Sequence, residues 1–132
     1  MNALDTNVLV RFLVNDDKKQ AAIIRKKITQ CEDQKEILYV STLVVLELIL
    51  VLESVYKVDR RSIIQSINAV ISMPVLEFEH QDTLRRFIEA ARHSQYDLSN
   101  ILIAQTAASS GCNTTYTFDK KASKFSLFEL LS

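Results

Sequence analysis

The chain has 132 residues, and 16 Lys and Arg balance 16 Asp and Glu, so the formal net charge is zero. This length suits a single domain over residues 1–132, and a hydrophobic fraction of 48% excludes a disordered chain and supports a sizeable core. There is one glycine and one proline, where average usage gives roughly 9 and 7. This scarcity argues against the many tight turns of a β-sandwich or barrel.

Short apolar runs alternate with longer amphipathic stretches along the chain. The runs predict strands at residues 3–4, 37–40, 75–77, 114–118 and 126–130. The stretches predict helices at residues 8–14, 17–31, 42–55, 60–72, 80–92, and from 97 or 99 to about 107. Ser41 and Asp59 are good N-caps for two of the helices, and Gly111 closes the last one. The alternation predicts an α/β sandwich with a short, mainly parallel central sheet.

Several features bear on the environment in which this protein works. A neutral chain has no global attraction to nucleic acid or acidic membranes, so such binding has to come from local patches. Cys31 and Cys112 lie far apart without CxxC spacing, which argues against a disulfide framework or a zinc site. The longest apolar stretch, residues 43–52, contains Glu47 and is too short to span a bilayer. The N-terminal segment lacks the basic start and uninterrupted apolar core of a signal peptide, so we expect a cytoplasmic protein without membrane association.

A few polar positions stand out from the pattern. Asp5 and Asp119 each follow a predicted strand, where open parallel sheets form their sites. Glu47 interrupts an apolar helix, so we expect its carboxylate to be at least partly buried and to need a cation, a metal or a proton. Asp97 and Asn100 share a first helical turn. Each position also has an ordinary interpretation: the aspartates as helix caps, Asn100 as a polar first-turn residue, and Glu47 in a salt bridge or a solvent-facing stripe.

Taken together, the order of these residues indicates a metal site. Carboxylates that converge on one site repel one another, and a divalent cation relieves that repulsion. Oxygen ligands suit Mg²⁺ or Mn²⁺. Such a metal can activate water and stabilise the charge that develops on a phosphate during hydrolysis.

Four segments occur in a specific order: LDTNVLVR at residues 4–11, VSTLVVLE at 40–47, YDLSNILIA at 96–104 and TFD at 117–119. In this order they resemble PIN-domain proteins, and most of all the VapC-type toxins of bacterial toxin–antitoxin pairs. The resemblance covers essentially the whole chain. It implies a PIN-domain α/β/α sandwich and an endoribonuclease that depends on Mg²⁺ or Mn²⁺. It also implies RNA as the substrate, a cognate antitoxin that blocks the site, and a homodimer.

By position, the resemblance assigns a set of catalytic residues: Asp5, Glu47, Asp97, Asn100 and Asp119. The four carboxylates among them would ligate the metal, and Asn7 and Thr117 would orient those ligands. Asn100 departs from the family, which usually has Asp just before the Leu-Ile-Ala-like stretch, and the change removes one negative charge while keeping a neutral oxygen. We expect Asp97, one turn earlier, to compensate for the lost charge. The alternative is therefore a catalytically weakened PIN domain that binds RNA or the antitoxin.

The predicted RNA contacts are the positively charged side chains near the acidic positions, Arg11, Lys120, Lys121 and Lys124. The three lysines follow Asp119, and the arginine is close in sequence to Asp5. A receiver-like phosphorylation module is a further alternative of a different class. It requires an adjacent acidic pair after the first strand and an acceptor Asp after the third, whereas Asp5 stands alone and residues 75–77 offer no acceptor.

Overall fold

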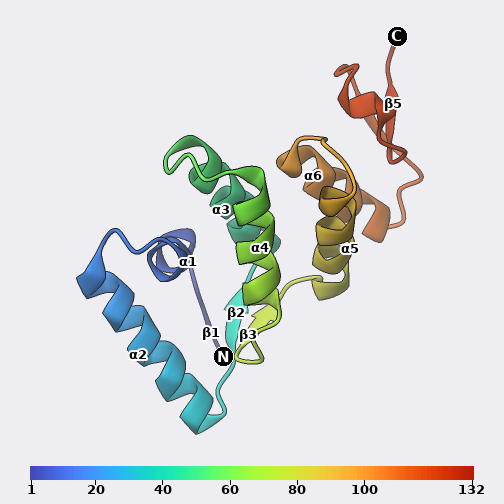
Figure 1. The fold of residues 1–132 in the computed structure, drawn as a ribbon. Helices are drawn as coiled ribbons and strands as arrows, with labels where there is room; N and C mark the ends of the chain where they lie inside the picture. The colour runs from blue at the N-terminus through green and yellow to red at the C-terminus, as the bar shows by residue number, and fades with distance from the viewer. The chain divides into compact units, whose positions relative to one another are not determined.

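The computed structural model describes residues 1–132, in which short strands alternate with helices (Figure 1). The chain divides into two units, Met1–Gln81 and Asp82–Ser132. Five strands form two parallel sheets, of three strands in the first unit and two in the second. None of the helices combines the length and the apolar character needed to span a bilayer.

The first unit is built on the sheet of β1 (Asn2–Ala3), β2 (Leu38–Val40) and β3 (Leu76–Phe78), in that spatial order. All the pairings are parallel, with Leu38 opposite both Asn2 and Leu76. Parallel neighbours need a crossover connection, and each crossover here is a pair of helices. Because the strands point the same way, the residues that follow them emerge at one edge of the sheet.

The crossover helices of the first unit are α1 (Thr6–Leu13), α2 (Lys18–Gln34), α3 (Thr42–Ser54) and α4 (Arg60–Ile71). Each begins at a side chain that accepts a hydrogen bond from the backbone N–H three residues later, and these N-caps are Asp5, Asp17, Ser41 and Asp59. An N-cap of this kind stabilises a helix by about 1 kcal/mol. Ser41 and Asp59 are caps that the sequence predicts, and a cap is also the ordinary interpretation of Asp5.

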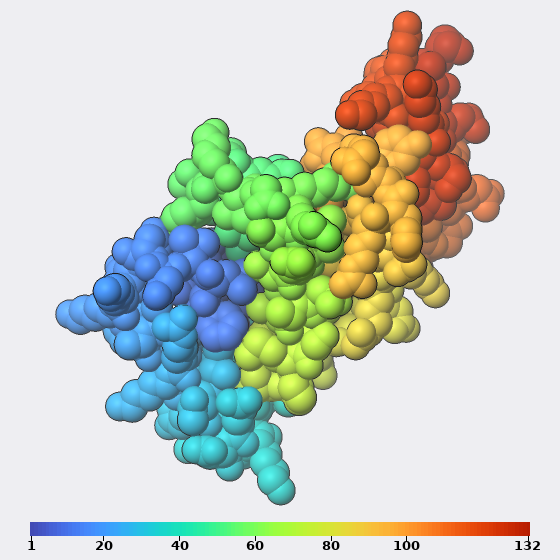
Figure 2. Space-filling model, viewed as in Figure 1, coloured from blue at the N-terminus to red at the C-terminus, as the bar shows by residue number.

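Helix α1 packs against both α2 and α3. Figure 2 shows the blue surface of α1 and α2 adjoining the green surface of the α3–α4 hairpin. The core beneath is aliphatic, and its fully buried members include Leu9, Leu48, Ile49, Leu52, Ile63, Ile67 and Ile71. Burying a side chain of this size contributes about 1.5–3 kcal/mol each, so this contact holds α1 in place.

The second unit contains α5 (Gln81–Arg92) from Asp82 onward, α6 (Leu98–Ser109), β4 (Thr115–Thr117), the short helix η1 (Ala122–Lys124) and β5 (Phe128–Leu130). Strands β4 and β5 pair in parallel, with Thr115 opposite Phe128. The rings of Tyr96 and Phe125 lie 5.3 Å apart. The buried side chains of α5 and α6 include Leu84, Phe87, Ile88, Leu98, Ile101 and Leu102.

Helix α6 ends in a glycine turn, as the sequence predicts. Gly111 has a φ of 95°, a region that side chains with a Cβ rarely adopt. The N–H of Gly111 donates to the Ala108 carbonyl at 3.0 Å, and the N–H of Cys112 donates to the Ala107 carbonyl at 3.1 Å. These two bonds satisfy carbonyls at the end of the helix.

The predicted strands and helices are confirmed in type and order, with boundaries that move by a few residues. The mixed α/β class with a short parallel sheet is confirmed as well. Cys31 is buried, Cys112 is exposed, and both are free.

Candidate metal and nuclease site

Asp5 lies at the carboxyl edge of the first sheet, directly before α1. Its backbone is extended and its Oδ1 accepts a hydrogen bond from the N–H of Val8 at 3.1 Å. The ordinary interpretation of Asp5 as a helix cap therefore holds. The residue is also exposed, so the cap leaves the carboxylate accessible.

Glu47 lies in the second turn of α3, and its Oε1 accepts a hydrogen bond from the hydroxyl of Thr6. The sequence predicts a carboxylate that is at least partly buried: the residue as a whole is exposed, but the hydrogen bond that it accepts from Thr6 is partly buried. Its neighbours on the same side of α3 are exposed too, Leu43 by 77% and Leu50 by 46%. Helix α3 carries apolar residues nearly all round, but only one side of the helix is buried in the core of the first unit.

The first turn of α1 connects these two carboxylates. Asp5 caps the helix, and Thr6, the next residue, binds Glu47 from a segment 41 residues away. Asn7 follows and is exposed; the structure gives it no hydrogen bond to either carboxylate, so its orienting role stays a prediction. No group of three or more His, Cys, Asp or Glu side chains that could hold a metal forms within either unit.

Asp119 lies just after β4 in the second unit and organises a tight turn. Its Oδ1 accepts hydrogen bonds from the N–H groups of Lys121 at 2.9 Å and Ala122 at 3.0 Å. The hydroxyl oxygen of Thr117 accepts a hydrogen bond from the N–H of Asp119 at 3.0 Å. Thr117 thus contacts the backbone of Asp119, and its role in orienting the carboxylate stays a prediction.

Asp97 is the N-cap of α6. Its Oδ1 accepts hydrogen bonds from the N–H of Ser99 at 3.1 Å and from the Ser99 hydroxyl at 3.0 Å. Asn100 is half-buried in the same first turn. The two side chains therefore share one helix end, as the spacing predicts.

The four predicted carboxylates have chemistry that fits a hard divalent cation. Each uses one oxygen for its bonds to the protein and leaves the other without a protein partner. All four residues are exposed, and carboxylates that bind through one oxygen are ordinary ligands of Mg²⁺ and Mn²⁺. Asp59 differs, because Ser62 occupies both of its oxygens and the Ser62 hydroxyl lowers the pKa of this carboxyl.

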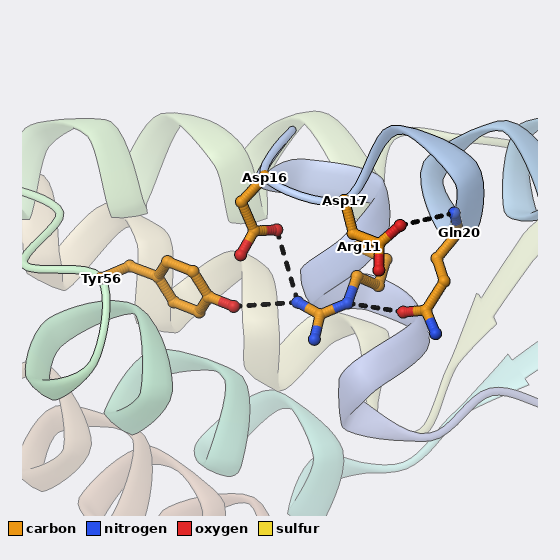
Figure 3. Close-up of polar contacts among 5 residues, drawn as sticks. All are labelled: Arg11, Asp16, Asp17, Gln20 and Tyr56. Atoms are coloured by element: carbon orange, nitrogen blue, oxygen red, sulfur yellow. Dashed lines mark hydrogen bonds and ion pairs between the residues drawn. The ribbon is translucent and has the colours of Figure 1, made fainter.

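Arg11 is the one predicted RNA contact in the first unit, and it is engaged by its own protein (Figure 3). Its Nε donates to Gln20 at 2.7 Å, and its Nη1 donates to the Tyr56 hydroxyl at 2.9 Å and lies 3.4 Å from Asp16. The hydrogen bond to Tyr56, more than the nearby carboxylates, raises the pKa of Arg11. These contacts assign Arg11 a structural role, and its contact with RNA stays a prediction.

The lysines of the second unit are free of such contacts. Lys120, Lys121 and Lys124 are exposed, and the turn at Asp119 and η1 carries all three. A cluster of accessible ammonium groups next to an accessible carboxylate suits a polyanionic substrate.

A groove of about 460 Å³ lies between α1 and α2 and reaches Asp5. Asp5, Asn7 and Arg11 contribute polar groups to its wall, and Leu4, Val8 and Ile24 are among its apolar residues. Any ligand that occupies this groove comes close to the exposed carboxylate of Asp5.

The sequence analysis missed two polar residues of this region. Thr6 lies between two selected residues, and its burial on the same side of α1 as Leu9 and Val10 follows from helical spacing. Glu79 is the first residue after β3 and Asp5 is the second residue after β1, so the same rule about strand ends finds Glu79. Its Oε1 accepts a hydrogen bond from the N–H of Thr42 at 2.9 Å, which lowers the pKa of Glu79.

Comparison with known proteins adds one match. The family model for the PIN domain matches residues 3–126, which include parts of both units and all four of the segments selected from the sequence. No curated protein matches the chain.

Proposed function

The chain belongs to the PIN-domain family, whose members are generally nucleases, and from this premise we propose that it is a metal-dependent endoribonuclease and the toxin of a toxin–antitoxin pair. The observation that carries the proposal is the first turn of α1. There Thr6, which binds Glu47, directly follows Asp5 in the chain. Two of the predicted metal ligands, Asp5 and Glu47, are therefore attached to the same helical turn.

The proposed ligands of Mg²⁺ or Mn²⁺ are Asp5, Glu47, Asp97 and Asp119, with Asn100 as a neutral oxygen donor. When bound, such a cation lowers the pKa of a water molecule and stabilises negative charge on the phosphate that is attacked. The family match over residues 3–126 supports treating both units as parts of one PIN domain.

The protein's own residues have distinct tasks in this proposal. The N–H of Val8 holds the Asp5 carboxylate, and the N–H groups of Lys121 and Ala122 hold that of Asp119. Fixed ligands need no rearrangement when the metal binds. The ammonium groups of Lys120, Lys121 and Lys124 attract RNA phosphates without reading sequence.

The toxin assignment brings further proposals with it. We propose a cognate antitoxin as the natural inhibitor and a second copy of the chain as a partner, both supported by the resemblance to VapC-type proteins. The free and exposed thiol of Cys112 suits a reducing compartment, which supports the proposed cytoplasmic location.

Asn100 favours a second candidate function, an RNA- or antitoxin-binding PIN domain with weakened catalysis. An amide in place of a carboxylate removes one charge from the proposed ligand set, and charge count sets the affinity of an oxygen site. Asn100→Asp separates the candidates, because it creates or raises metal-dependent cleavage if the parent is weakened. A parent that already cleaves well with Mg²⁺ rules out the second candidate.

The test of the proposed nuclease is cleavage of total RNA with and without Mg²⁺ or Mn²⁺. Asp5→Asn keeps a good N-cap, so the fold should survive while cleavage is lost. Asp59→Asn is the matched control, because it makes the same change at a cap away from the proposed ligands. An Asp5→Asn variant that cuts RNA as fast as the parent overturns the assignment.

A further inference from the structure

The hydroxyl of Thr6 has one partner in the structure, the carboxylate of Glu47. Thr6 is only 5% exposed, whereas Glu47 is exposed. A buried donor therefore reaches out from α1 to an accessible carboxylate on α3. We infer that Thr6 is a positioning residue that holds the Glu47 carboxylate at the first turn of α1, which Asp5 caps, for metal binding; this inference rests on the proposed function, because it matters for cleavage only if Glu47 is a ligand.

The hydroxyl of Thr6 is not needed for the local structure of α1. Thr6 is the first residue of the helix, and the cap position is already filled by Asp5, which binds the N–H of Val8. Threonine hydroxyls inside helices commonly bond to the carbonyl four residues earlier, as Thr106 does with Leu102. In the first turn of a helix there is no such helical carbonyl, so the hydroxyl is free to bind Glu47.

An exposed glutamate side chain usually has no fixed hydrogen-bond donor that holds it in one orientation. Glutamate has several rotatable bonds, and ordering such a side chain costs conformational free energy. Threonine is stiff at χ1 because of its branched Cβ, and burial restricts Thr6 further. The hydrogen bond therefore selects one orientation of Glu47 before a metal arrives, so that less of this cost falls on the binding step.

The hydrogen bond from Thr6 leaves one oxygen of the Glu47 carboxylate available for a metal. Thr6 occupies Oε1 of Glu47, and Oε2 has no protein partner. Asp5 is engaged in the same way, with Oδ1 bound to Val8 and Oδ2 left over. Thr6 is bonded to Asp5 along the chain and to Glu47 through the side chain, so it links both carboxylates to the same helical turn.

A second contact keeps α1 in register with α3. Arg11, in the last turn of α1, donates to the hydroxyl of Tyr56, which lies two residues beyond the end of α3. Helix α1 is thus bonded to α3 near its start through Thr6 and to the segment after α3 near its end through Arg11. A tilt of α1 away from α3 has to break one of these bonds.

The experiment compares Mn²⁺ binding, measured by calorimetry, and cleavage kinetics in the parent, Thr6→Val and Thr6→Ser. Valine has nearly the same shape as threonine and no donor, while serine keeps the donor. Loss of an orienting partner typically costs about 10–100-fold in metal affinity or activity, so we expect Thr6→Val to bind Mn²⁺ at least about tenfold more weakly. Its kcat should fall with little change in KM for RNA, and Thr6→Ser should keep most of the parent's affinity.

A double variant shows whether the effect passes through Glu47. In a Glu47→Gln background the Thr6→Val change should no longer alter the affinity for Mn²⁺, because the carboxylate that it orients is absent. Thermal unfolding of each variant checks the fold, and Thr6→Ala removes the same hydroxyl if Thr6→Val does not fold. A Thr6→Val protein that is folded and binds Mn²⁺ like the parent overturns the inference alone. A parent that binds no Mn²⁺ overturns the proposed function and the inference with it.

Discussion

The guanidinium of Arg11 donates a hydrogen bond to the hydroxyl of Tyr56 across 2.9 Å, joining the last turn of α1 to a segment 45 residues later. The same guanidinium reaches Gln20 in α2. One side chain therefore connects three parts of the first unit, and the planar arrangement of its N–H groups makes this possible.

Replacement of Arg11 by lysine should lower the stability of the protein. Lysine keeps the charge but cannot donate to Gln20 and Tyr56 in the same geometry, so we expect the free energy of unfolding to fall. Urea denaturation measures this change. Arg25→Lys on the exposed surface of α2 is the control and should change stability by less than about 0.5 kcal/mol; equal effects at the two positions would contradict the structural role of Arg11.

Glu79 makes the stability of the first unit depend on pH. The N–H of Thr42 holds the pKa of Glu79 below its usual value, so the folded protein favours the charged form. The contribution of this group is therefore fully present above the pKa that it has in the unfolded chain, about 4.3, and is lost as the pH falls through the lower pKa of the folded state.

Glu79→Gln should remove this contribution. We expect the variant to be less stable than the parent at neutral pH, and the difference from the parent should shrink as the solution is acidified below the normal pKa of glutamate. Unfolding at a series of pH values tests this. Glu77→Gln, at an exposed position of β3, is the control; a loss at Glu79 that is the same at every pH would show that charge is not involved.

The three lysines that follow Asp119 should affect RNA binding more than chemistry. Changing Lys120, Lys121 and Lys124 to Ala should raise KM for RNA, leave kcat nearly unchanged and reduce the salt dependence of binding by a slope of about 0.7 per lost contact. Filter binding over a range of salt concentrations measures the slope. A triple Ala variant at Lys18, Lys19 and Lys26, all exposed on α2, is the control, and an equal loss there would mean a non-specific charge effect.

Gly111 allows the left-handed turn after α6. A Cβ at this position would meet no atom within 4 Å, so Gly111→Ala tests the backbone alone. The φ of 95° is unfavourable for alanine, and we expect a loss of about 1 kcal/mol in the free energy of unfolding. Ser110→Ala, at an ordinary φ of −87°, should have little effect on thermal unfolding, and a neutral Gly111→Ala would contradict the strained turn.

The helices and strands of this protein are determined largely by local sequence. Ser41 and Asp59 cap their helices with bonds that span three residues, and the buried positions of α2 and α4 follow from helical spacing. Such interactions join neighbours in the chain, so a sequence pattern is enough to predict them. The same holds for Asp5, whose capping bond also spans three residues.

Contacts between helices and strands that lie far apart in the chain could not be predicted from a local pattern, and only the tertiary structure determined them. Glu47 is exposed although its helix is apolar nearly all round, because burial depends on which side of α3 other elements cover. The partners of Thr6, Arg11 and Glu79 lie 41, 45 and 37 residues away along the chain. Each bond needs two separate helices or strand ends to meet at a particular register, and that meeting is set by packing of the core rather than by any pattern within either segment.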